Sequence, residues 1–142
     1  MKSYLFSMMA LMVTASHSFA QKGTTPPAAV KDAFEKKFTG ITKLHWSREG
    51  KTGFEASFIK DNAAMSAVYD ATGRLQETET AIAVNALPAT VIEHLQTHYK
   101  ESKIKETAKI TKASGIINYE AEVNGRDLLF DEAGTFIKSV KD

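Results

Sequence analysis

Two stretches of the sequence, AVYDATGRLQE at residues 67–77 and LLFDEAGTFIK at residues 128–138, follow one pattern. Each runs from an apolar pair through an aromatic residue to Asp, followed by two residues, Gly, one residue and an apolar residue. Asp can accept hydrogen bonds from the backbone of such a turn, and Gly can take the left-handed conformation that closes it. We therefore expect both stretches to be turns between antiparallel strands, with structural turn residues Asp70, Gly73, Asp131 and Gly134.

The similarity extends to two segments that precede these turns. PAAVKDAFEKKF at 27–38 and PATVIEHLQTHY at 88–99 both begin with Pro, and their apolar positions are 61 residues apart, like the two turns. Apolar residues at Val30, Phe34 and Phe38 have the spacing of one stripe of an amphipathic helix. Proline suits a helix start because its missing N–H is not needed there. Each segment is therefore predicted to be a helix.

Short alternating runs follow each predicted helix. KLHWSRE places Leu44 and Trp46 on one strand face, FEASF and IINYEAEV alternate in the same way, and Asn124–Gly125 suits a two-residue hairpin turn. Trp46 fits the core beside Leu44, and a contact role on the opposite face stays open. The sequence thus predicts an α+β fold of two tandem repeats, at about 27–79 and 88–140. Each repeat would be one helix packed on three to four antiparallel strands.

The N-terminus and the composition limit the functions that remain. Residues 1–20 have Lys2, an apolar run and a small-residue ending, which predict a signal peptide cleaved near Ala20, a single domain over 21–142 and a periplasmic or secreted product. The apolar run is too short to span a membrane. Without Lys2 the chain has 17 basic and 17 acidic residues and no Cys. Nothing in this balance indicates nucleic-acid binding, and thiol chemistry is excluded.

The repeated order of motifs resembles a known family. A Pro-started helix ending in an aromatic residue, a strand with Trp46, aromatic-Glu-Ala and aromatic-Asp-x-x-Gly are similar to exported PepSY-like modules, also described as beta-lactamase-inhibitor-like, of Bacteroidetes-type bacteria. The resemblance implies one continuous curved sheet with both helices on one side, and a binding or inhibitory role without catalysis. The chain departs from the pattern in having Thr39 after Phe38 and no aromatic residue at the second counterpart of Trp46, taken as Ile110.

Catalytic and metal sites find little support in the sequence. His94 and His98 have the i, i+4 spacing of a metal pair, but no third ligand is within sequence reach, and the helical wheel places His94 toward solvent and His98 beside the apolar stripe. Asp70 and Asp131 are explained by their turns, and no nucleophile elbow is present. We expect no enzyme activity, no metal and no cofactor.

The strand face opposite the predicted core is the candidate partner-binding face. Alternation assigns to it the residues His45, Glu55, Ser57, Ile59, Ser66, Val68, Glu120, Glu122 and Leu129. A plain solvated face with cross-strand pairs such as Glu122 with Arg126 is the alternative. We expect a monomeric, exported, non-enzymatic module that binds or inhibits another exported protein, such as an enzyme. The alternative function is a periplasmic carrier of a small ligand or metal.

Overall fold

The computed structural model describes residues 23–141 of the chain. The predicted signal peptide and its cleavage near Ala20 lie outside these residues. Within them, the chain forms two α-helices, one short 3-10 helix and eight strands. In chain order the elements are α1 (Ala28–Lys37), β1 (Thr42–Glu49), β2 (Gly53–Lys60), β3 (Ala63–Tyr69), β4 (Leu75–Ala81), η1 (Val84–Ala86), α2 (Ala89–His98), β5 (Ile104–Lys112), β6 (Ile117–Val123), β7 (Arg126–Asp131) and β8 (Phe136–Lys141).

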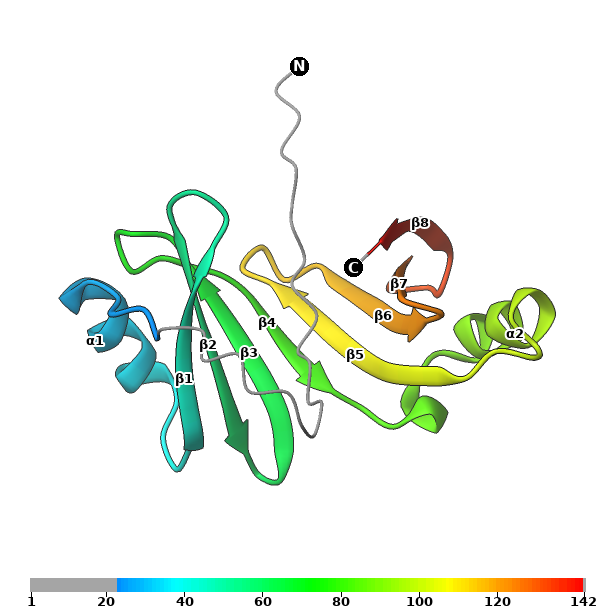
Figure 1. The fold of residues 1–142 in the computed structure, drawn as a ribbon, viewed down its shortest axis with the longest axis horizontal. Coiled ribbons are helices and arrows are strands. Elements are labelled where there is room, and N and C mark those ends of the chain that lie inside the picture. The colour runs from blue at the N-terminus through cyan, green and yellow to red at the C-terminus, as the bar shows by residue number, and fades with distance from the viewer. Residues whose placement is uncertain (1–22, 142) are drawn as a thin grey trace, which may run out of the picture.

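The strands form one open antiparallel sheet in the order β1 to β8, so every strand pairs with its neighbour in the chain. Figure 1 shows α1 at the β1 end of the sheet and α2 at the other end, beside β5 to β8. β4 and β5 pair directly, with Glu79 opposite Ile110, and this pairing joins the two halves. The predicted α+β class, with two helices and antiparallel strands, is confirmed.

Both helices begin after a proline and bury one apolar stripe. The Pro27 carbonyl accepts hydrogen bonds from the backbone N–H of Val30 and of Lys31, and Pro88 does the same for Val91 and Ile92. α1 buries Val30 and Phe34, and α2 buries Val91 and Leu95. A stripe spaced by four residues gives each helix one face that must be covered, and the sheet covers it.

Two apolar clusters lie between the helices and the sheet. The first is aromatic: Phe34 contacts the rings of Trp46 and Phe58 at centroid distances of 5.2 and 5.1 Å. The second is mostly aliphatic and packs Val91 and Leu95 against strands β6 and β7. Cross-strand partners share a face, and the register connects the first cluster with the second through β4 and β5. Both helices therefore cover the same face of the sheet.

The two turns that share a sequence pattern contact the helix starts. Gly73 and Gly134 have φ of 86° and 84°. The Asp70 carboxylate accepts from the backbone N–H of Thr72 and of Arg74. A Cβ on Gly73 would lie 2.5 Å from the Ala29 carbonyl oxygen in α1, and one on Gly134 would lie 1.9 Å from the Thr90 hydroxyl in α2. Glycine is required here by both the conformation and the close approach.

Two expectations about strand faces are wrong. Leu44 does not pack in the core beside Trp46. It lies in the irregular part of β1, where Lys43 has a φ of 54° and the β1–β2 register shifts, and it is 43% exposed. A bulge of this kind interrupts the alternation on which the expectation rested. The counterpart of Trp46 is not Ile110 either. Trp46 pairs with Ala56, and the matching Ala121 pairs with Thr107.

Candidate protein-binding face

The sheet face opposite the two helices is called the open face here. The strand register places all nine residues predicted from the sequence on this face. Each of them alternates along its strand with a core residue, and each pairs across strands, or alternates along its own strand, with another member of the set. They fall into two groups. The first lies on β1–β3 (His45, Glu55, Ser57, Ile59, Ser66 and Val68) and the second on β6 and β7 (Glu120, Glu122 and Leu129).

Sequence reasoning missed the middle of this face. β4 and β5 lie between the two groups, and they contribute Glu77, Glu79 and Glu106 by register with Val68, Ser66 and Glu122. The sequence QETETA at residues 76–81 contains the pattern that predicts this. Glu and Thr alternate there, as they would in a strand that places its acidic side chains on one face. Acidic residues are depleted in strands as a rule, so alternation in a segment of this composition is a weak strand signal.

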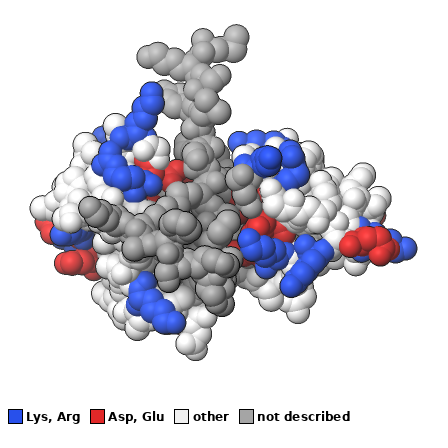
Figure 2. All heavy atoms as spheres, viewed as in Figure 1, with Lys and Arg blue, Asp and Glu red and all other residues white. Residues whose placement is uncertain are grey.

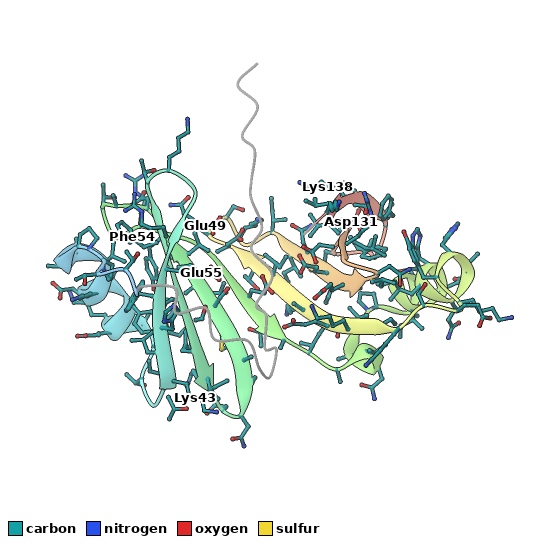
Figure 3. The ribbon with its side chains drawn as sticks, viewed as in Figure 1. Lys43, Glu49, Phe54, Glu55, Asp131 and Lys138 are labelled. Atoms are coloured by element: carbon teal, nitrogen blue, oxygen red, sulfur yellow. The ribbon has the colours of Figure 1, made fainter. Side chains whose placement is uncertain are left out.

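The completed face is strongly acidic. Besides the turn residue Asp131, eight of the 17 acidic residues of the chain lie on it by register. This acidic set is Glu49, Glu55, Glu77, Glu79, Glu106, Glu120, Glu122 and Asp127. Figure 2 shows acidic side chains near the middle of the molecule with lysines and arginines around them, and Figure 3 shows Glu49 and Glu55 on the neighbouring strands β1 and β2.

Burial and like charges raise the pKa of several of these carboxyl groups. Burial, followed by the charges of Glu55, Glu106, Glu77 and Asp127, raises the pKa of Glu79 to about 8. The pKa of Glu49 is raised to about 7, first by burial and then by Glu55 and Glu77. Burial also raises the pKa of Glu106 and of Glu55, the latter against hydrogen bonds from Ser66 and Ser47. The face therefore changes charge in the range around neutral pH.

Lysines pair with two members of the acidic set. Lys112 donates to Glu77 across β4 and β5, and the Lys105 ammonium lies 2.7 Å from Oε1 of Glu122. The predicted pairing of Glu122 with Arg126 is wrong, because Asp127 stands opposite Glu122 and Arg126 donates to the Ser139 hydroxyl instead. The face accordingly juxtaposes two carboxylates where the sequence analysis expected an ion pair.

The helix histidines are packed against aromatic rings. The ring of His94 is 4.5 Å from that of His98 and stacks on Phe136 at 5.1 Å, with Phe130 at its edge. His94 is half-buried and His98 is exposed, the reverse of the expectation, because β8 packs over this side of α2. Within residues 23–141, no group of three or more His, Asp and Glu side chains is arranged to hold a metal ion.

No helix in the described part of the chain is long and apolar enough to cross a membrane.

The family model described as "Putative beta-lactamase-inhibitor-like, PepSY-like" matches residues 52–138. No curated protein matches the sequence.

Solved structures with the same fold come from Bacteroides species. One, described as "a putative periplasmic proteins from Bacteroides eggerthii DSM 20697", superposes with a TM-score of 0.75 at 14% identity, over 82% of this chain and 89% of that chain. A "DUF2874 family protein from Bacteroides uniformis ATCC 8492" gives 0.72 at 16% identity over 82% and 89%. A "BLIP-like protein (BF1215) from Bacteroides fragilis NCTC 9343" gives 0.66 at 23% identity over 84% and 89%.

Proposed function

Because the chain belongs to the PepSY-like, beta-lactamase-inhibitor-like family, we propose that it is an exported, non-enzymatic module that binds another exported protein through the open face. Inhibition of an exported enzyme is one form that this binding would take. The observation that carries the proposal is the asymmetry of the sheet: α1 and α2 cover one face, and the other face presents charged and apolar side chains of eight neighbouring strands.

The apolar residues of the open face support a binding role. Ile59, Val68 and Leu129 are half-buried side chains on strands whose other outward positions are small or charged. Binding energy in protein interfaces is concentrated in a few apolar or aromatic residues near the centre, with rim charges contributing little. These three side chains are the candidates for such anchors.

The proposal includes a repeat architecture and export. The two halves, about 27–79 and 88–140, would be tandem repeats of one ancestral unit, supported by the matched contacts of Gly73 with Ala29 and of Gly134 with Thr90. Cleavage of a signal peptide near Ala20 would release a monomer made of residues 21–142 into the periplasm. The description of the Bacteroides eggerthii structure as periplasmic supports this location.

A triple substitution tests the proposed face. Ile59→Arg, Val68→Arg and Leu129→Arg together should abolish capture of the partner from periplasmic extract, while the melting temperature changes by a few degrees only, since surface changes cost under about 0.5 kcal/mol each. The matched control adds the same charge on exposed helix positions, with Ala28→Arg, Gln96→Arg and Thr97→Arg. The control should capture the partner as the wild type does.

Two outcomes would count against the proposal. Normal capture by a stable triple variant would move the binding surface to the helices or loops. A large loss of stability would mean that these three side chains belong to the packed core, and the open face would then lack its apolar anchors.

A further inference from the structure

The charges of the open face are unbalanced. The acidic set has eight carboxyl groups, and three lysines lie beside it. Lys105 and Lys112 contact Glu122 and Glu77, and Lys138 stands opposite Leu129 on β8. Figure 3 shows Lys138 on the side of the molecule away from Glu49 and Glu55. The chain as a whole has 18 basic and 17 acidic residues, so the imbalance is a property of this face and not of the composition.

We propose that the protein bound at the open face presents an extended Lys- or Arg-rich segment to the acidic set, an inference that rests on the proposed function. Complementary charges across an interface fix the register of the partner and exclude partners of the wrong sign. An acidic sheet face selects against acidic partners for the same reason.

The spacing of the carboxylates fits an extended segment. Glu77 and Glu79 are alternate residues of β4, and Glu120 and Glu122 are alternate residues of β6. Alternate residues of a strand project from the same face roughly 7 Å apart, and neighbouring strands are separated by about 4.8 Å. A segment in extended conformation repeats at the same 7 Å, so basic residues at alternate positions meet successive carboxylates. Arg would add bidentate hydrogen bonds to this match.

Glu122 supplies an independent indication of a cationic guest. Its side chain is 4% exposed, and Oε1 accepts the hydrogen bond from Lys105. Its other oxygen, Oε2, is buried and has no hydrogen-bond partner among the described residues. Glu122 stands between Glu106 and Asp127 on the open face. A buried carboxylate oxygen without a donor is destabilising, and a donor from a basic partner would satisfy it.

The titration of the face gives the proposal a pH signature. A bound cation favours the ionised form of a carboxyl, so binding should release protons from Glu79 and Glu49, whose pKa values are raised to about 8 and about 7. Affinity should accordingly increase as the pH rises from about 6 to about 8.5. Glu77 lies beside Glu79 on the same strand, and the neighbouring groups from other strands are Glu55, Ser66, Glu106, Ile110, Lys112 and Asp127.

A peptide pair tests the charge requirement directly. The probe is a fluorescein-labelled nine-residue peptide with Lys and Gly at alternate positions, and its matched control has Glu in place of Lys. Fluorescence anisotropy with the mature protein should detect binding of the Lys peptide only, with affinity that falls as salt rises and increases with pH as above. Equal binding of both peptides, or of neither, would overturn the proposal.

A pair of double variants locates the binding. Glu79→Gln with Glu106→Gln removes two carboxyls from the centre of the open face, and we expect the Lys peptide to bind about tenfold more weakly. Asp32→Asn with Glu35→Gln makes the same change of charge on the exposed side of α1 and should bind the peptide unchanged. Equal weakening in both variants would show that net charge alone attracts the peptide, and would contradict the proposal.

The two proposals fail in different ways. If the natural partner is captured through Ile59, Val68 and Leu129 but capture is insensitive to Glu79→Gln with Glu106→Gln, the open face binds a partner that is not basic. The inference about charge is then wrong and the proposed function stands. If capture survives the triple Arg variant as well, both are wrong.

Discussion

The two faces of the same strands have opposite chemistry. In β2, Phe54, Ala56 and Phe58 are buried against α1, while Glu55 and Ser57 alternate with them on the open face. In β6, Tyr119, Ala121 and Val123 pack against α2, and Glu120 and Glu122 alternate with them. The same strands therefore have two different faces. The helix-covered face stabilises the fold, and the open face brings together carboxyl groups, most of which are buried or half-buried.

The open face acts against stability. Carboxyl groups whose pKa values are raised by burial and by like charges are held in a state that folding disfavours. The aromatic cluster under α1 has the opposite effect, because Phe34 is 1% exposed and its ring contacts four other aromatic rings. The two faces of the sheet therefore contribute to stability with opposite sign.

The largest effect is expected from the helix-covered face. Phe34→Ala should lower the free energy of unfolding by about 3–5 kcal/mol, because it leaves a cavity in the aromatic cluster. Ser57→Ala on the open face is the comparison, and we expect a change within about 0.5 kcal/mol. Urea denaturation followed by circular dichroism measures both. Similar losses in the two variants would mean that the two faces do not differ as described.

The turns that contact the helix starts come next. Gly73→Val should destabilise by more than about 1 kcal/mol, because a β-branched residue is strained at this φ and its Cβ would meet the Ala29 carbonyl. Gly50→Val separates the backbone strain from the steric contact. Gly50 also has a positive φ, 55°, but an added Cβ there would have nothing within 4 Å. Gly73→Val should therefore be the worse of the two in thermal melts. Equal losses of stability in the two variants would mean that the close approach of Gly73 to α1 contributes nothing to the destabilisation.

A smaller effect is expected from pH. The pKa of Glu79 is raised from 4.5 to about 8 in the folded protein, so folding favours the protonated carboxyl group. The stability that this preference contributes is fully present below pH 4.5 and is lost as the pH rises through 8. Glu49 acts in the same direction up to about pH 7. The melting temperature of the wild type should fall between pH 5 and pH 8.5, and Glu79→Gln should reduce that slope. A slope that is unchanged in Glu79→Gln would show that this carboxyl is not the source.

What the sequence could predict depended on how local the signal was. The helix stripe of Val30 and Phe34 and the family resemblance were found because each requires only neighbouring residues or a repeated order of motifs. The expected position of Leu44 was wrong because β1 is irregular around Lys43, which has a left-handed conformation. The sequence gives no sign of this irregularity, since Lys is not a residue that favours such a conformation.

The acidic set was missed for a different reason. Its members come from strands β1, β2, β4, β5, β6 and β7, and only the register of those strands brings them together. Glu77 and Glu106 are far apart in the chain, and a pattern within one segment cannot show that they share a face. The equality of 17 basic and 17 acidic residues in the chain after Lys2 also concealed the local excess. A charge count made strand by strand on the outward positions would have found it.

Nuclear magnetic resonance tests the central claim, binding at the open face, most directly. With the mature protein labelled with ¹⁵N, the Lys-Gly peptide is added and the backbone amide shifts are followed residue by residue. The account predicts that the largest changes fall on β2, β4, β5 and β6 around Glu55, Glu79, Glu106 and Glu122, with α1 and α2 unaffected. Changes concentrated on the helices, or spread evenly over the exposed acidic residues, would contradict it.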